Sequence, residues 1–216
     1  RELKFPLCNC HACRELIDKL PGKFHISNTS KKWVLEHNFH FALNKIFKIK
    51  QNIYSGEFRN YIEKEIHNST LTAASLRWID RHYQKAIAQR YPIIGDYPLI
   101  CIGQESYLRP EIRNYMERLI KNITPAQFYP LIFILPCAAH KPYSKSRSHH
   151  KFHQAIQDIV NSYDLKYHEV IITSPIGVVP RELETIFPIA HYDIPVTGDW
   201  DQTEIHATGD LLFQWL

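Results

Sequence analysis

A short segment of the chain combines a thiol, several cations and several hydroxyl groups, and these residue types can carry out nucleophilic chemistry. Residues 136–149 read PCAAHKPYSKSRSH and follow an apolar run, residues 131–135, which predicts a buried strand. In α/β proteins the loop at the carboxyl end of such a strand often presents the reacting groups. Cys137 is the candidate nucleophile, because a thiolate attacks electrophilic carbon atoms. The competing interpretation makes it a small buried apolar side chain.

A second group of chemically active residues opens the chain, where Cys8, Cys10 and Cys13 lie within six residues of one another. This spacing disfavours disulfides and suits thiolate ligands of a tetrahedral zinc ion, which needs a fourth ligand from elsewhere. The histidines available for that place are His11, His25, His37 and His40. A closed site of this kind is structural, because no coordination position stays open. The alternative is a reduced cysteine turn without metal.

Apolar periodicity predicts helices in the first part of the chain. One helix begins near Trp33 and ends at Gly56, and a short helix covers residues 58–66. A third helix is expected over residues 70–87, before Pro92.

After residue 92, strands and helices alternate. We expect strands at residues 97–102, 131–135, 167–173 and 191–196, and helices at residues 110–121, 149–161, 180–184 and 201–216. Such alternation predicts an α/β layer with a largely parallel sheet. The predicted fold class is therefore α/β, or α+β overall: a helical zinc-binding region, residues 1–91, followed by an α/β core domain, residues 92–216.

The composition excludes a membrane protein and favours a folded core. The 216 residues are 44% hydrophobic and 22% charged, with no signal-peptide pattern and no membrane-spanning apolar run. We therefore expect a cytoplasmic chain. The formal net charge of +4 permits nucleic-acid binding without requiring it. Because the chain begins with Arg1 rather than Met, we expect an excised or truncated sequence.

The Cys-x-Cys-x-x-Cys pattern, followed by a helix that contains His37 and Asn38, resembles the zinc site of tRNA-guanine transglycosylases. In that family three cysteines and the histidine of the His-Asn pair hold a structural zinc ion. The resemblance covers about residues 1–60 and implies Cys8, Cys10, Cys13 and His37 as the zinc ligands. The transglycosylase barrel with its catalytic aspartates is not found in this sequence, so base exchange is not implied.

The pattern Pro-Cys-x-x-x-Lys-Pro-Tyr-x-x-Ser-x-x-His at residues 136–149 resembles the core motif of the archaeosine synthase family of archaeal tRNA-modifying enzymes. Residues 173–184 and 191–200 fit the same family, and the resemblance spans about residues 92–210. It implies addition of an amine to the nitrile of 7-cyano-7-deazaguanine in the D-loop of tRNA. The amine is free lysine in the current picture of the family and glutamine in an older one. A radical S-adenosylmethionine enzyme then acts on the product.

The resemblance implies a catalytic group made of Cys137, Lys141, Tyr143, Ser146 and His149. Cys137 adds to the nitrile, and the amine displaces it from the resulting thioimidate. Lys141, His140, His149 and the N-terminus of the following helix would lower the pKa of the thiol, and His149 or Lys141 would protonate the imidate nitrogen. Tyr143 and Ser146 orient the base or a phosphate. If lysine attacks directly, the thiol is dispensable and Lys141 and His149 are the essential groups. In the blander interpretations Lys141 only contacts a phosphate and Tyr143 is structural.

The predicted substrate-binding residues are polar groups on the same loop and on two later segments. They are Ser144, Arg147, Ser174, Arg181, Glu182 and Asp193. Arg181 and Glu182 would hold lysine or a phosphate, and Asp193 would hold an ammonium group. The simpler alternatives are a rigid turn at residues 175–180 and an arginine partner for Asp193.

Selection of one tRNA position needs contacts beyond a small site. Lys145, Arg147 and Lys151 are the predicted backbone contacts. We find no terminal RNA-binding domain of the PUA type, so we expect a partner subunit that carries the missing barrel or RNA-binding domain. Two alternative functions are a non-catalytic tRNA-binding scaffold subunit and a glutamine-dependent amidinotransferase.

Overall fold

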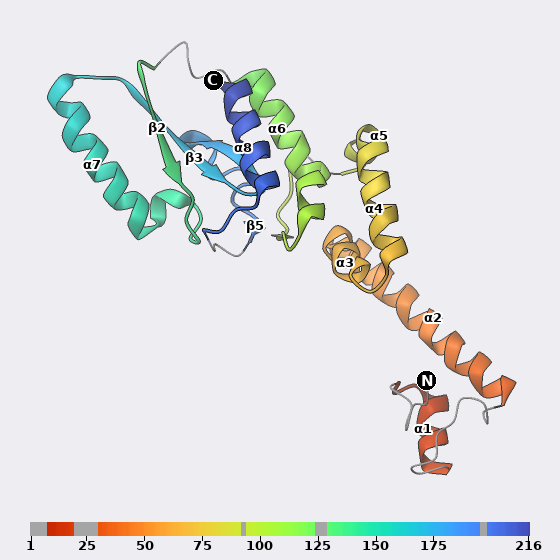
Figure 1. Cartoon of the computed structure of the whole chain (residues 1–216). Helices are drawn as coiled ribbons and strands as arrows, with labels where there is room; N and C mark the ends of the chain where they lie inside the picture. The colour runs from red at the N-terminus through yellow and green to blue at the C-terminus, as the bar shows by residue number, and fades with distance from the viewer. Residues whose placement is uncertain (1–7, 20–29, 92–93, 124–128, 195–197) are drawn as a thin grey trace. The chain divides into compact units, whose positions relative to one another are not determined.

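The computed structural model describes residues 8–19, 30–91, 94–123, 129–194 and 198–216. The chain divides into two compact units, Arg1–Tyr61 and Ile62–Leu216 (Figure 1). The domain boundary predicted near residue 92 stays a prediction.

The first unit contains two helices that pack against each other, α1 (His11–Lys19) and α2 (Lys31–Tyr54). The Ser30 side chain caps α2 by accepting a hydrogen bond of 3.2 Å from the backbone amide of Trp33. The predicted helix near Trp33 is confirmed, and it begins two residues earlier. Although α2 has 24 residues, neither it nor any other helix in the described ranges is long and apolar enough to cross a membrane.

Three further helices follow: α3 (Phe58–Ile66), α4 (Thr70–His82) and α5 (Gln84–Ala88). The short helix at residues 58–66 is confirmed. The prediction of one continuous helix over residues 70–87 is wrong, because Tyr83 leaves the helical conformation (φ −119°, ψ 21°) and separates α4 from α5.

The strands of the second unit form two sheets. In one sheet, β1 (Leu99–Ile100) pairs in parallel with β5 (Tyr192–Asp193). In the other, β2 (Leu131–Pro136) is parallel to β3 (Tyr167–Thr173), with Leu131 opposite Tyr167. The central strand β3 is antiparallel to β4 (Gly177–Pro180).

Helices cover both faces of the three-stranded sheet (Figure 1). On one face α7 (Arg147–Tyr163) packs Ile156 and Val160 against Leu135. On the other face α6 (Pro110–Asn122) and α8 (Gln202–Trp215) contribute Ile112 and Trp215 to the main core, which also holds residues of β3 and β4. This layered arrangement of helices around parallel strands confirms the predicted fold class.

The antiparallel strand β4 was not predicted; the sequence indicated only a rigid turn at residues 175–180. Gly177 explains the reversal, because its backbone adopts a positive φ of 88°. A Cβ atom at this position would lie 2.5 Å from Leu211 Cδ2 of α8, so a larger residue would clash. The chain therefore folds back on β3 and delivers Arg181 beside the sheet. Arg181–Leu183 then form a short 3-10 helix, η4, where a short helix was expected.

The strands β1 and β5 are shorter than predicted. After β1, Cys101–Gly103 lead into a 3-10 helix, η2 (Gln104–Leu108), which the sequence pattern did not reveal. The predicted end of the last strand lies partly outside the described residues. The other expected elements of the core are confirmed, and α7 begins two residues before the predicted start.

Candidate functional site

The four predicted metal ligands lie together in the first unit. The ligand atoms of Cys8, Cys10, Cys13 and His37 are all within 4.8 Å of one another. His37 Nδ1 lies 3.2 Å from Cys13 Sγ and 3.5 Å from Cys10 Sγ. A tetrahedral zinc ion with Zn–S bonds of about 2.3 Å and a Zn–N bond of about 2.0 Å places its ligand atoms about 3.5–3.8 Å apart. The arrangement therefore fits zinc, and among the candidate histidines that the structure describes, His37 is the one that lies with the three cysteines.

Local structure explains how these ligands meet. Cys13 lies in the first turn of α1 and is fully buried, whereas Cys8 and Cys10 precede the helix. Trp33 stacks on the His37 ring with centroids 5.5 Å apart, and its indole nitrogen donates a 2.6 Å hydrogen bond to the Ala12 carbonyl. These contacts fix the orientation of His37 relative to α1, as outer contacts around a metal site commonly do.

In the second unit, the ends of four strands bring together residues that lie far apart in the sequence. Cys101 follows β1, Cys137 follows β2, Thr173 ends β3 and Asp193 ends β5. The parallel strands point the same way within each sheet, so these residues lie at carboxyl ends, where α/β proteins place their sites. Tyr192 of β5 connects the two sheets, because its hydroxyl lies 2.5 Å from Thr173 Oγ1.

Lys141 and Cys137 lie in this region. The Lys141 ammonium sits 3.8 Å from the centroid of the Tyr192 ring, a cation–π contact. Burial lowers the pKa of Lys141, and the charges of Asp193, Cys137 and Cys101 partly oppose that shift. The predicted nucleophile and the predicted cation therefore interact electrostatically. A lowered pKa makes the Lys141 ammonium group a stronger acid than that of an exposed lysine.

Tyr143 connects this group to a second one. Its side chain is fully buried, and its hydroxyl contacts Tyr192 directly and Thr173 Oγ1 at 3.5 Å. Burial raises the pKa of Tyr143 to about 12, so its hydroxyl stays protonated. Its ring also stacks on His149, with centroids 5.5 Å apart.

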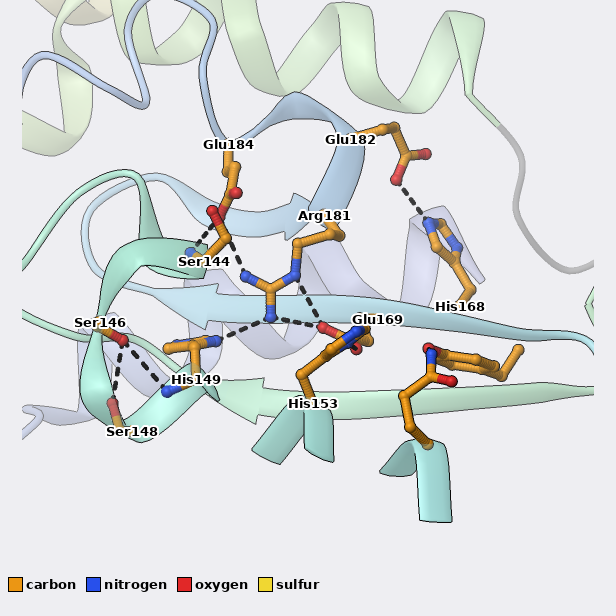
Figure 2. A network of polar contacts seen from close by, with 12 residues as sticks. Ser144, Ser146, Ser148, His149, His153, His168, Glu169, Arg181, Glu182 and Glu184 are labelled. Atoms are coloured by element: carbon orange, nitrogen blue, oxygen red, sulfur yellow. Dashed lines mark hydrogen bonds and ion pairs between the residues drawn. The ribbon is translucent and has the colours of Figure 1, made fainter. Parts of the chain in front are cut away.

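The second group is a polar network centred on Arg181 (Figure 2). The guanidinium contacts Glu169 at 2.6 Å and Glu184 at 3.0 Å, and both carboxylates are buried. Glu184 also accepts a 2.9 Å hydrogen bond from the backbone amide of Ser144. Burial opposes ionisation of Glu169, but hydrogen bonds from His153 and Arg181 hold its pKa below the ordinary value. The network thereby ties the loop after β2 to β3 and η4.

His149 belongs to the Arg181 network and is almost fully buried. Burial lowers its pKa, and the positive charge of Arg181 adds to the effect. Ser146 caps α7, since its hydroxyl accepts a 3.2 Å hydrogen bond from the His149 backbone amide. His149 is therefore neutral near pH 7, and it lends no positive charge to Cys137.

A pocket of about 510 Å³ lies beside the network, and its lining includes Ser144, His149, His168, Glu169, Arg181 and Glu182. Glu182 reaches His168 Nε2 at 2.9 Å, so it is directed away from Arg181 (Figure 2). The pocket combines a cation, carboxylates and imidazoles, which suits a polar ligand with both donors and acceptors.

The side chains of two predicted substrate-binding residues belong to neither group. Ser174 donates a 2.6 Å hydrogen bond to Glu204, which also accepts one from the Tyr107 hydroxyl. Arg147 is exposed in the first turn of α7. Asp193, in contrast, belongs to the Lys141 group.

The sequence left Tyr192 open as a packing residue or a contact, and it did not indicate Thr173, Glu169 or Glu184 as site residues. Tyr192 and Thr173 could have been found from their place at the ends of predicted strands. Glu169 interrupts an apolar strand, and a charged residue there indicates a buried ion pair. Nothing in the local sequence marks Glu184.

Comparisons with known proteins give the class of the chain. Residues 112–216 match the family model described as a domain of unknown function, DUF5591. The archaeosine synthase of Haloferax volcanii is 34% identical over 209 residues, which cover 97% of this chain and 33% of that protein. The archaeosine synthase subunit alpha of Thermococcus kodakarensis is 35% identical over 85% of this chain and 32% of its own length.

More distant similarity extends to the transglycosylases. The tRNA-guanine(15) transglycosylase of Methanocaldococcus jannaschii is 23% identical over the whole of this chain and 30% of that protein. A crystal structure of a protein of unknown function is 29% identical, with a TM-score of 0.32, over 47% of this chain and 29% of the other.

The chain is thus similar to archaeal proteins named archaeosine synthase and tRNA-guanine(15) transglycosylase. In particular, the resemblance to archaeosine synthases is confirmed, and it extends over nearly the whole chain, including the cysteine cluster. The chain spans about a third of the length of these relatives.

Proposed function

We propose that this chain adds free lysine to the nitrile of 7-cyano-7-deazaguanine in tRNA, as a transferase acting in archaeosine biosynthesis. The observation that carries the proposal is the gathering of Cys137, Lys141 and Tyr143 at the carboxyl ends of the strands, beside Asp193. The similarity of this chain to archaeosine synthases supports tRNA as the substrate.

The reaction proceeds in two balanced steps. First, Lys141 in its neutral form takes the proton of the Cys137 thiol, the sulfur bonds to the nitrile carbon, and Lys141 returns the proton to the nitrogen. The product is a thioimidate. Second, the lysine amine bonds to the same carbon, and the carbon–sulfur bond breaks. The amine proton passes through Lys141 to the departing sulfur, and an amidine is left. The whole lysine is retained and no further reactant is consumed.

We assign proton transfer to Lys141 and a positioning role to His149 in this scheme. Lys141 interacts electrostatically with Cys137 and has a lowered pKa, whereas His149 Nδ1 accepts a hydrogen bond from Arg181. His149 supports Tyr143 by stacking, and Ser146 supports His149 by capping α7. The buried Tyr143 hydroxyl, held protonated, bonds to Thr173 and Tyr192, so Tyr143 is proposed to position the base indirectly, by holding the loop after β2 against these residues.

Substrate contacts are assigned from charge and position. Asp193 suits the ammonium group of lysine, because it is a carboxylate beside the reacting groups. Ser144, Arg181 and Glu182 line the 510 Å³ pocket and are proposed to contact the modified nucleoside. Ser174 is proposed to hold the amine donor through Glu204. Exposed Arg147 is proposed to contact the tRNA backbone.

The first unit holds a structural zinc ion through Cys8, Cys10, Cys13 and His37 in this proposal. A zinc ion bound by four protein ligands fixes the fold and takes no part in the reaction. A partner subunit, as the name of the Thermococcus relative suggests, helps select the tRNA. A radical S-adenosylmethionine enzyme then acts on the lysine adduct.

The proposal is tested by incubating the chain with lysine and tRNA that carries the nitrile base, and then weighing the nucleosides after digestion. A nucleoside heavier by one intact lysine supports it. Nitrogen transfer from glutamine without lysine in the product identifies the amidinotransferase alternative. A tRNA that is bound but unchanged, even with the partner subunit present, identifies the scaffold alternative.

A further inference from the structure

Tyr192 is held rigidly where the two sheets of the second unit meet. The residue is only 3% exposed and lies in β5, opposite Leu99 of β1. Its hydroxyl contacts both Tyr143 and Thr173, so the ring is anchored at the backbone and at its far end. Burial raises the pKa of Tyr192 well above the ordinary value, so the hydroxyl remains a neutral hydrogen-bonding group.

The ring face of Tyr192 carries the Lys141 ammonium at 3.8 Å from its centroid. In the described part of the chain, no hydrogen bond or ion pair of the Lys141 side chain accompanies this contact. The charged or ionisable groups that act on Lys141 are Asp193 from β5, Cys137 from the loop after β2 and Cys101 from the end of β1. The ring is therefore the contact that determines where the amine lies among these groups.

We propose that Tyr192 is a positioning residue for Lys141: its ring face holds the lysine amine at the carboxyl ends of the strands, and its hydroxyl bonds to Tyr143 and Thr173 hold the ring. The catalytic role of Lys141 rests on the proposed function. The position of Lys141 on the ring is independent of the proposed function, and it can be measured without substrate.

The chemical consequence follows from the aromatic ring's charge distribution. The electron-rich face attracts an ammonium group, so it favours the protonated form of Lys141 while burial favours the neutral form. The ring face and burial therefore act in opposite directions on the pKa of Lys141. A ring of equal shape with an electron-poor face removes the attraction and leaves the packing intact.

The test compares the full chain carrying Tyr192→Phe with the full chain carrying pentafluorophenylalanine at position 192. Both side chains lack the hydroxyl and have the same shape, but the fluorinated face repels a cation. Acylation of Lys141 by acetic anhydride is followed against pH by peptide mass spectrometry. Acylation of exposed Lys145 in the same molecules corrects for reagent loss.

The acylation rate of Lys141 rises with pH, and the midpoint of that rise reports its pKa. At a given pH below the midpoint, we expect Lys141 of the fluorinated protein to be acylated about 2- to 30-fold faster than in Tyr192→Phe, because the neutral form is more populated. Equal midpoints in the two proteins would overturn the proposal. A second outcome is that the midpoints differ but both proteins form the lysine adduct at the same rate. In that case Tyr192 positions Lys141 as proposed, and the proposed catalytic role of Lys141 is wrong.

Discussion

His149 Nδ1 accepts a hydrogen bond of 2.8 Å from Arg181 Nη2 (Figure 2). A guanidinium group can only donate, so this contact fixes His149 as the neutral tautomer with its proton on Nε2. The backbone of Pro136 opposes the lowered pKa of His149 only in part, and the buried Nε2 atom has no hydrogen-bond partner among the described residues. The motif histidine is thus bound into the scaffold that supports Tyr143.

The first prediction concerns the pH dependence of stability. Folding lowers the pKa of His149. Below the ordinary histidine pKa of about 6.5, the unfolded chain therefore binds a proton at this residue that the folded chain does not bind. The stability from His149 is present above that pH and is lost as the pH falls toward the folded pKa. Urea unfolding from pH 7.5 to 5.5 should therefore show a steeper loss in the wild type than in His149→Asn. Parallel profiles would contradict the assignment.

The second prediction concerns Arg181. Arg181→Met leaves the buried carboxylates of Glu169 and Glu184 without their cation, so the free energy of unfolding should fall by about 3–5 kcal/mol. Arg147→Met, in an exposed part of α7, serves as the matched control and should change it by less than about 0.5 kcal/mol. Chemical denaturation of both variants measures the difference. Similar losses would show that the network contributes little.

The sequence predicted the parts of this site that depend on local pattern. The strand at residues 131–136 and the loop that follows it place Cys137 and Lys141 as expected, because an apolar run and a motif mark them. The residues of the 136–149 motif divide between the Lys141 group and the Arg181 network, and this division could not be predicted. It depends on the contact of Tyr143 with Tyr192 and on the hydrogen bond from the Ser144 amide to Glu184. Those contacts join residues 40 or more positions apart and leave no periodic signal.

The third prediction concerns the metal group. His37→Ala should abolish binding of one zinc ion per chain, because it removes the ligand atom 3.2 Å from Cys13 Sγ. His40→Ala, three residues later on α2, should retain the zinc. Metal content by mass spectrometry and helix content by circular dichroism distinguish the two. Zinc retained in both variants would point to a different fourth ligand.

The fourth prediction separates proton transfer from phosphate contact at Lys141. Lys141→Arg keeps the positive charge but cannot release a proton at neutral pH. If Lys141 transfers protons, the rate of lysine incorporation should fall about 10²- to 10⁴-fold in Lys141→Arg, as in Lys141→Met. An arginine variant with near wild-type activity would favour the phosphate contact.

The most direct measurement omits lysine and asks whether tRNA that carries the nitrile base becomes covalently attached to the protein. We predict a thioimidate linkage at Cys137, visible as a conjugate in a denaturing gel and located by peptide mass spectrometry. Addition of lysine should release the tRNA as the adduct, and Cys137→Ala should form neither conjugate nor adduct. A Cys137→Ala protein that makes the lysine adduct at the wild-type rate would contradict nucleophilic catalysis by this thiol.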